Sequence, residues 1–345
     1  MSLKVGIARD ERFSEHKTGH FHPEHPNRLT AIYRMIDQDF ADKVLNFKPE
    51  PAMLEHIERV HVPGHIRRIL KTAEQRVTSL APDTPISASS YLAAWLAVGA
   101  CLQGVDQMMA KECDAFFALV RPPGHHALAD RAGGFCIFNN IGIAAKYAIE
   151  TYHLERILII DWDIHHGNGI HDLFYDDPRV LYLSTHDLML YPYSGEIDQT
   201  GAGPGEGYTV NIPIDRAFSD DDMIYVYREI LTPLFLKYAP QFIMIAAGFD
   251  AHADDPIGRS RLSEKAYAGI TRLLVSLREV IASPPLLFAL EGGYDLRALT
   301  RSVKAVISEL INEQETDVTS LSYSQDAVNL VARVQKTHSK YGMIK

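Results

Sequence analysis

The sequence predicts an α/β fold built around a parallel sheet. Short apolar runs rich in β-branched residues alternate with longer segments whose apolar periodicity and capping residues indicate helices. Strands that alternate with helices favour parallel pairing, because each crossover lays a helix over a face of the sheet. The 345 residues suffice for one large domain or two smaller ones. No linker, repeat or low-complexity tract divides the sequence, so we expect a single domain over residues 1–345.

The composition is that of an ordinary globular protein. Hydrophobic residues make up 46% and charged residues 23% of the chain, and the formal net charge of −10 disfavours nucleic-acid binding. Three cysteines (Cys101, Cys113 and Cys136) without CxxC spacing argue against a disulfide framework or a cysteine zinc site. Residues 1–7 resemble a first strand rather than a signal peptide, and the longest apolar stretch, 91–102, is too short to span a bilayer. We expect a reduced, cytoplasmic protein with no membrane partner.

The elements are expected in the following order. Strands are predicted where apolar runs stop at polar residues or glycine: 1–7, 115–120, 157–160, 180–184, 242–247 and 286–290. Helices are predicted at 26–40, 91–110, 140–152, 219–238, from 263 onward and at 327–336. Ser219, followed by three aspartates, is a good helix start, because a hydroxyl and acids suit the amino-terminal end of a helix. Residues 75–90 and the glycine-rich run 201–207 are predicted to be loops.

Residues 16–28 are rich in histidine, proline and glycine, which indicates a loop. Four histidines in this loop, His16, His20, His22 and His25, invite a metal-binding interpretation. However, HxH spacing on a proline-broken loop is weak support for one. We therefore expect a surface or substrate-rim loop rather than a second metal site.

Polar side chains follow four of the predicted strands. In chain order they are His125 and His126, then Asp161, Asp163 and His165, then Asp250, and finally Tyr294. The carboxyl ends of parallel strands share one edge, where ligands bind, so these side chains are expected in one crevice. Residues two apart on an extended chain point to the same face, so Asp163 and His165 converge, with Asp161 as a supporting acceptor.

These residue types suit metal-dependent hydrolysis. Asp163, His165 and Asp250 supply three N/O ligands and leave a position open for water, which is the pattern of a catalytic zinc site. Such a metal polarises a carbonyl and lowers the pKa of its water. Adjacent imidazoles can act as base and acid, and Tyr294 can donate a hydrogen bond to the developing oxyanion. The pattern therefore predicts hydrolysis of an amide or ester.

With these motifs in place, the chain resembles the histone deacetylase family. The motifs are RPPGHH at 121–126, GGFCIFNN at 133–140, DWDIHHGNG at 161–169, AAGFDAHADDP at 246–256 and LEGGY at 290–294. The resemblance covers about residues 15–310, and Asn168 is similar to the class II branch, since class I members carry aspartate there. It implies a three-layer arginase/deacetylase fold, with an eight-stranded parallel sheet and helices on both faces. Residues 311–345 would form a C-terminal helical extension.

The resemblance also implies roles for the motif residues. Asp163, His165 and Asp250 would bind one Zn²⁺ per chain. His126 would be the general base and acid, and His125 its electrostatic partner. Asp161 would orient His125 and Asn168 would orient His126. This division makes physical sense, because a carboxylate partner favours imidazolium while a neutral amide leaves an imidazole freer to accept a proton.

A channel and two structural potassium sites are implied in the same way. Phe135 and Tyr191 would flank the acyl-lysine channel, and Gly134 would line it. The first potassium site would involve residues on two neighbouring strands: Asp161, Asp163, His165, Ser184 and Thr185. The second would involve Phe174, Asp177, Val180 and Tyr208.

The substrate is expected to be an acetylated lysine peptide or a similar small acetylated amine. Some acetylpolyamine-selective relatives place a glutamate at the channel rim, where this chain has Ile257. Isoleucine cannot pair with an ammonium group, which would lose hydration without compensation. The alternative, an acetylpolyamine amidohydrolase, stays open because acidic residues such as Asp83 or Glu24 could substitute. Homo-oligomerisation is also left open.

Two further interpretations fit less well. A two-metal ureohydrolase on the same fold requires additional bridging carboxylates, but Gly167 and His252 stand where aspartates would be needed. A catalytically silent acyl-ligand binding protein would most simply have lost Tyr294 or one of the histidines, and all are present. An active hydrolase with one metal ion is therefore favoured.

Overall fold

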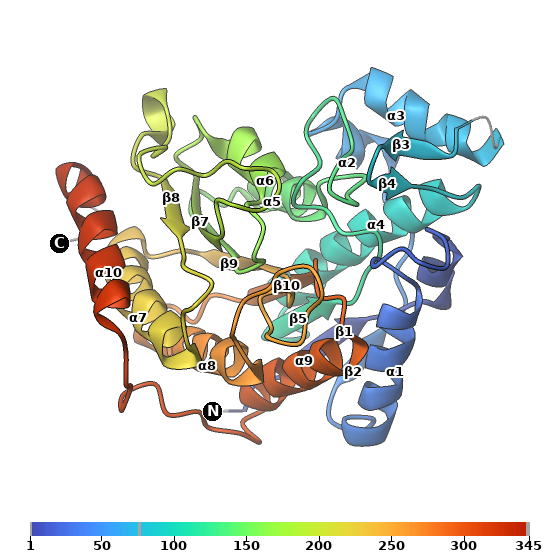
Figure 1. Cartoon of the computed structure of the whole chain (residues 1–345). Coiled ribbons are helices and arrows are strands. Elements are labelled where there is room, and N and C mark those ends of the chain that lie inside the picture. The colour runs from blue at the N-terminus through green and yellow to red at the C-terminus, as the bar shows by residue number, and fades with distance from the viewer. Residues whose placement is uncertain (1, 75–76, 343–345) are drawn as a thin grey trace.

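The computed structural model describes residues 2–74 and 77–342, and the main sheet in this part of the chain has eight strands. They lie in the order β2–β1–β5–β10–β9–β6–β7–β8, with parallel neighbours throughout, at the centre of the molecule (Figure 1). The strands are β1 (Val5–Ala8), β2 (Leu45–Phe47), β5 (Ala115–Ala118), β6 (Ile157–Asp161), β7 (Val180–His186), β8 (Thr209–Pro213), β9 (Phe242–Ala247) and β10 (Leu286–Leu290). The expected eight-stranded parallel sheet is confirmed.

Two groups of helices cover the sheet (Figure 1). One layer contains α1 (Asn27–Asp39), α9 (Leu296–Leu310), α8 (Glu264–Val280) and α7 (Asp220–Tyr238), each packed against the next, and α10 (Gln325–His338) packs on α7. On the other side lie α4 (Ser90–Met109) and α5 (Asn140–Tyr152), with α2 (Leu54–Glu58), α3 (Pro63–Leu70) and α6 (Asn168–Phe174). None of the helices in the described residues has the length and apolarity needed to cross a bilayer.

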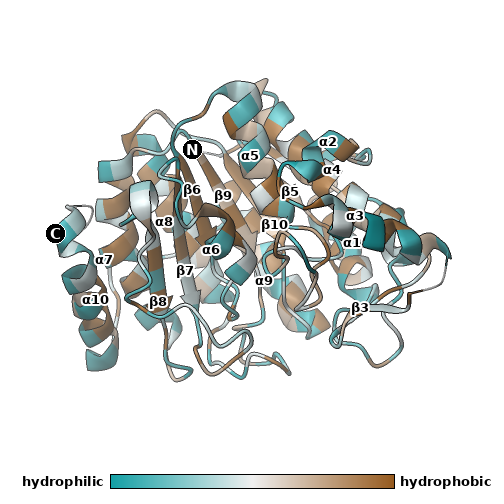
Figure 2. Cartoon of the chain, turned by 90° about the horizontal axis from the view of Figure 1, so that it is seen from above, coloured by the Kyte–Doolittle hydropathy of each residue, from teal (hydrophilic) through white to brown (hydrophobic). Residues whose placement is uncertain are grey.

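The core lies between these layers. Seen from above, the strands form a brown, apolar layer inside helices that carry many teal residues (Figure 2). Every residue of β5, β6, β9 and β10 is buried. Such strands read as continuous apolar runs because both of their faces are covered. This explains why the strands predicted from the sequence agree with those in the structure.

Capping residues explain the accurate helix boundaries. The side chain of Ser219 accepts a hydrogen bond from Asp222 N, and the Asp222 carboxylate accepts one from Ser219 N, which together form a capping box at the start of α7. At α5, the side chain of Asn139 accepts a hydrogen bond from Gly142 N at 2.8 Å. The predicted helix over 140–152 is confirmed at both ends.

Other elements were not predicted, among them β2, β8, α6 and α9. The loop predicted at 75–90 includes two residues outside the described part of the chain. The remainder contains an antiparallel pair, β3 (Ser79–Ala81) and β4 (Thr84–Pro85). The prolines hid this pair, since proline is tolerated at the edge of a sheet as well as in loops.

The surface assignment of the histidine-rich loop is wrong for part of its length. His16, Glu24 and Arg28 are buried, although Phe21 between them is fully exposed. Glu24 accepts hydrogen bonds from the guanidinium groups of Arg28 (3.1 Å) and Arg121 (2.6 Å). A buried carboxylate needs such partners, and here two cations flank one acid. Glu24 is therefore not an acidic rim residue.

Candidate active site

Four adjacent strands, β5, β10, β9 and β6, carry the chemistry-bearing motifs at their carboxyl ends. Asp161 pairs in register with Ala246, and Leu290 pairs with Ala247, so neighbouring strands end level with each other. The structure thus brings the residues predicted at these ends to one edge of the sheet. They are His125, His126, Asp161, Asp163, His165, Asp250 and Tyr294.

Asp163, His165 and Asp250 present ligand atoms that all lie within 4.8 Å of one another. Nδ1 of His165 lies 3.0 Å from Asp163 Oδ1 and 3.0 Å from Asp250 Oδ2. All three residues are buried. Two carboxylates that converge on one imidazole nitrogen form an N/O donor set suited to a divalent cation such as zinc. The residues present fit one catalytic metal ion.

The electrostatics of this cluster agree with a cation site. Burial, helped by Asp163, raises the pKa of Asp250 to about 7. Burial also opposes ionisation of Asp163, yet the nearby imidazoles of His125 and His165 hold its pKa below the ordinary value. Burial disfavours a charged His165, but Asp250 and Asp163 raise its pKa well above the ordinary value. The two carboxylates therefore favour positive charge between them.

Gly292 packs directly against the carboxylates of this cluster. Its backbone N–H donates to Asp163 Oδ2 at 2.9 Å. A Cβ atom at Gly292 would collide with the carboxylates of Asp250 and Asp163. Only glycine permits this close approach of backbone to carboxylate.

His125 is paired with a carboxylate. Its Nδ1 lies 3.1 Å from Asp161 Oδ2, and both side chains are buried. Burial works against a charged imidazole, but Asp161, Asp163 and Glu291 raise the pKa of His125 to about 10. His125 is therefore held as an imidazolium at neutral pH.

His126 has the opposite character. Its Nδ1 lies 2.8 Å from the side-chain Oδ1 of Asn168, the first residue of α6. Burial, together with the positive charge on His125 and His165, lowers its pKa well below the ordinary value. Since the Asn168 oxygen only accepts, Nδ1 of the neutral ring carries the proton and Nε2 is left as the basic atom.

Tyr294 lies four residues beyond the end of β10. Its backbone N–H donates to Asp255 Oδ2 at 2.6 Å, and the Arg28 guanidinium lies 5.0 Å from the ring centroid. Burial and then Asp250 raise the pKa of Tyr294 well above its ordinary value. The phenol therefore keeps its proton at neutral pH and can donate a hydrogen bond.

Phe135 lies beside Tyr294, with 5.7 Å between ring centroids and perpendicular planes. Its φ of 67° places it in the left-handed region. Two bonds to the β3–β4 hairpin hold this turn: Gly134 N donates to Asp83 Oδ2 (3.1 Å), and Phe135 N donates to Thr84 Oγ1 (3.2 Å). The hairpin that the sequence did not predict therefore positions one of the predicted channel residues.

Tyr191 lies beside His126, the second of the tandem histidines. Its ring centroid is 4.9 Å from that of His126. A Cβ at Gly134 (φ 56°) would collide with His126 and come within 2.8 Å of the Tyr191 ring. Phe135, Gly134 and Tyr191 thus gather around His126 and Tyr294.

Ile257 lies in a neighbouring groove with a volume of about 1190 Å³. The groove is also lined by residues 187–190, by the segment after β8 and by α10. One of its lining residues, Leu190, directly precedes Tyr191 in the chain. Ile257 is half-buried there.

The residues expected to hold potassium ions lie in two places. Asp161 and Ser184 are register partners on β6 and β7. Elsewhere, Asp177 N donates to the Phe174 carbonyl at 3.1 Å, and Val180 N donates to the Asp177 carbonyl at 3.2 Å. Both potassium sites remain predictions, because their expected ligands are mostly backbone carbonyls, which every residue carries.

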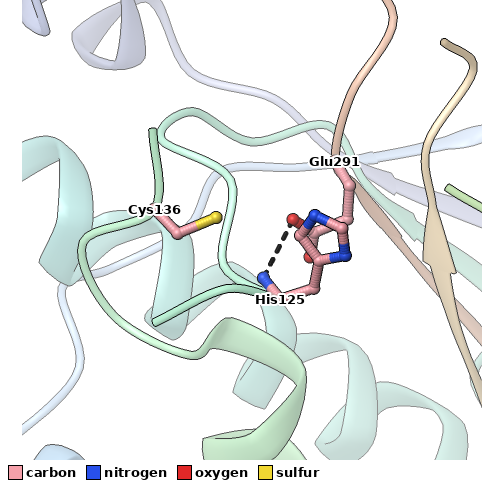
Figure 3. A group of neighbouring side chains, drawn as sticks. All are labelled: His125, Cys136 and Glu291. Atoms are coloured by element: carbon pink, nitrogen blue, oxygen red, sulfur yellow. Dashed lines mark hydrogen bonds between the residues drawn. The ribbon is translucent and has the colours of Figure 1, made fainter. Parts of the chain in front are cut away.

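A second buried group, His125, Cys136 and Glu291, also has ligand-type atoms within 4.8 Å of one another (Figure 3). Burial raises the pKa of the Cys136 thiol well above its ordinary value, and His125 is held protonated. Metal ligation requires a thiolate and a neutral imidazole, so this group suits a metal ion poorly. No role was predicted for Glu291 from the sequence, although a lone acid directly after a buried strand was a usable signal.

Comparisons with known proteins agree on one family. The histone deacetylase domain family matches residues 22–310. A probable deacetylase of Archaeoglobus fulgidus is 34% identical over 98% of this chain and 99% of its own length. Histone deacetylase HDA1 of Candida albicans is 33% identical over 98% of this chain, which spans 44% of that longer protein. The crystal structure of the HDA15 HD domain aligns with a TM-score of 0.91 at 32% identity, over 98% of this chain and 95% of that one. This likeness confirms the arginase/deacetylase-type fold.

Proposed function

The chain belongs to the histone deacetylase family, and we propose that it is a zinc-dependent amidohydrolase that removes acetyl groups from acetyl-lysine side chains. One observation carries the proposal. Two adjacent histidines have opposite protonation preferences beside an Asp–His–Asp cluster that fits one divalent cation. Pairs of titratable groups whose pKa values are pushed apart are typical of acid–base catalysis.

In this proposal Asp163, His165 and Asp250 hold the metal. A zinc ion there would supply Lewis acidity that polarises the amide carbonyl and makes a water molecule more acidic. The donor set has no sulfur and only one nitrogen, so iron or cobalt would also be chemically acceptable.

The chain's own groups move the protons. Nε2 of His126 accepts a proton from the attacking water, because its ring is neutral and Asn168 fixes the tautomer. The same imidazolium then donates that proton to the leaving amine. His125 stays charged against Asp161 and stabilises negative charge that develops beside it. The Tyr294 hydroxyl donates to the oxygen of the tetrahedral intermediate.

Two observations favour an acetyl-lysine peptide over a free acetylated amine. Glu24 is neutralised by two arginines and does not supply a rim charge. The groove that contains Ile257 is also lined by Leu190, the residue before Tyr191, and has more volume than a small acetylated diamine would fill. Residues that flank the acetylated lysine in a peptide could lie along it.

The acetylpolyamine alternative is supported by one residue, Asp83. Its carboxylate contacts the channel turn through Gly134 N, and its negative charge contributes to raising the pKa of Tyr191 to about 12, after the larger effect of burial. A carboxylate there would attract a secondary ammonium.

A two-metal ureohydrolase site has less support. His252, which stands where a bridging aspartate would be needed, contacts Glu264 at 3.1 Å and accepts a hydrogen bond from Asp254 N.

The deciding experiment compares kcat/KM for an acetyl-lysine peptide with that for acetylputrescine and acetylspermidine, by measuring acetate release. We expect the peptide to be the better substrate. A tenfold or greater preference for acetylputrescine would refute the substrate assignment and leave the hydrolytic mechanism intact. No acetate from any of the three would refute the proposed function itself.

We also propose structural K⁺ at the two predicted sites, which potassium analysis of the purified protein would test.

A further inference from the structure

Glu291 is a fully buried acid that the mechanism above does not use. It directly follows β10, and its carboxylate points to the loop that carries the tandem histidines (Figure 3). Oε2 accepts two backbone hydrogen bonds, from Gly124 N at 2.7 Å and from His125 N at 3.1 Å. One oxygen atom thus binds two successive amides of that loop.

The next amide of the loop is held by a neighbouring buried side chain. His126 N donates to Cys136 Sγ at 3.5 Å, and this thiol donates to the Gly134 carbonyl at 3.3 Å. Three consecutive N–H groups, at residues 124–126, therefore point to buried acceptors. Successive amides of this kind form a concave site for an acceptor oxygen, and here that oxygen belongs to Glu291, whose pKa burial raises to about 7.

The backbone that carries the Glu291 carboxyl group is also held in place. Arg28 donates from its guanidinium group to the backbone carbonyls of Glu291 and, at 2.7 Å, of Gly293. Oε1 of Glu291 is buried and has no hydrogen-bond partner among the residues that the structure describes. A buried acid with one unsatisfied oxygen costs stability, so fold stability does not account for its presence.

We propose that Glu291 is a positioning residue for the reaction. It anchors the backbone from which both imidazoles project, and so keeps His125 against Asp161 and His126 against Asn168. This inference rests on the proposed function, because it assigns Glu291 a part in the same reaction. A displacement of about 1 Å in a catalytic group can lower the rate on the order of a hundredfold, so a backbone anchor at this point is expected to act on kcat.

Two substitutions separate the effect of the length of the Glu291 side chain from the effect of its acidic group. Glu291→Gln keeps the length of the side chain and one oxygen that can accept both amides, but removes the ionisable group. Glu291→Asp keeps the acidic group but is one methylene shorter, so it cannot reach both amides. We expect kcat within about threefold of the wild type for Gln and a fall of about tenfold or more for Asp. For both variants we expect KM and metal content to stay unchanged.

Glu309 provides a matched control. It is also fully buried, its Oε1 accepts two hydrogen bonds from Thr316, and its Oε2 has no partner within the described residues. It lies near the far end of α9, about 20 Å along the helix from Tyr294. Glu309→Gln and Glu309→Asp are expected to change Tm about as much as the Glu291 variants do, with kcat within about twofold of the wild type.

A second readout does not depend on activity. The downfield imidazole N–H resonances of His125 and His126 in the zinc-loaded protein should shift in Glu291→Asp and stay in place in Glu291→Gln. These signals would test the anchor even if the wild-type protein released no acetate. The inference is overturned if Asp behaves as the wild type does, if Gln loses as much kcat as Asp, or if the Glu309 variants lose kcat equally.

Discussion

Asn168 contacts the proposed general base, His126, and favours its Nδ1–H tautomer, and Asn168→Asp is the most direct test of this arrangement. The substitution places a carboxylate at the position from which Asn168 Oδ1 now contacts His126 Nδ1 at 2.8 Å. His125 shows what such a partner does: its contact with Asp161 is similar at 3.1 Å, and its pKa is raised to about 10. The substitution should therefore raise the pKa of His126.

The magnitude follows from the geometry. Two unit charges about 4 Å apart interact by about 4 kcal/mol at an effective dielectric constant of about 20, which corresponds to about 3 pKa units as an upper limit. Burial and the positive charges on His125 and His165 still lower the pKa of His126, and burying a further carboxylate opposes the change. We expect a net rise of about 1–3 units.

The effect on the pH profile has a definite sign. A base with a raised pKa stays protonated, and inactive, up to a higher pH. The acidic limb of kcat/KM for an acetyl-lysine peptide should therefore move up by about 1–3 pH units, with rates converging toward the alkaline side. The profile would be measured from about pH 5 to pH 9 on zinc-loaded protein of verified metal content.

Asn168→Ala is the matched control. It removes the orienting group without adding charge, so it should lower kcat and leave the acidic limb at or below its wild-type position. His126→Ala should be more damaging than either, because it removes the base itself. An Asn168→Asp profile that superimposes on the wild type, with metal retained, would refute the assignment of His126 as the base.

Four further outcomes are expected. Tyr294→Phe should lower kcat on the order of a hundredfold, equivalent to about 3 kcal/mol, with the metal retained; a near-wild-type rate would exclude its role as oxyanion donor. Chelation should abolish acetate release and one equivalent of Zn²⁺ should restore it, whereas two tightly bound transition metals by elemental analysis would favour a ureohydrolase. Ile257→Glu should shift the kcat/KM ratio toward acetylpolyamines, and an unchanged ratio would separate Ile257 from substrate choice. Glu24→Gln should destabilise the fold by about 3–5 kcal/mol near neutral pH, because it leaves buried guanidinium groups unpaired. Burial opposes ionisation of Glu24, but Arg121 lowers its pKa to about 2, so the difference in urea-unfolding free energy should shrink as the pH falls below about 4.5 toward that value; a difference independent of pH would contradict this account.

The sequence predicted the strands of the site and the polar residues that gather at their ends, because both signals are local. A buried parallel strand is a continuous apolar run, and the polar residues that stop it are visible beside it. The order β5–β10–β9–β6 was not predictable in the same way, since β10 lies between β5 and β9 although a long stretch of chain separates it from β5. Strand order depends on pairing between distant segments, and no local pattern encodes it.

The buried polar residues were harder to predict. Glu24, Arg28 and Arg121 are of residue types that usually lie on the surface, and only their mutual contacts show that they lie inside. Charged residues are almost never fully buried unless paired. Arg28 is only four residues from Glu24, but Arg121, which completes the cluster, lies 97 residues away in the sequence. The same applies to Glu291, whose partners are backbone amides that carry no side-chain signal.

Arg28 connects these buried residues to the chemistry of the site. Its charge is balanced by Glu24, its guanidinium binds the carbonyls of Glu291 and Gly293, and it lies over the ring of Tyr294. A cation beside a phenol favours the phenolate, so Arg28 partly offsets the rise in the pKa of Tyr294 that burial and the metal-ligand carboxylates cause. In the proposed mechanism this makes the hydroxyl a better donor to the oxyanion. In this proposal the histidine-rich loop contributes to catalysis through Glu24 and the adjoining Arg28 rather than through its histidines.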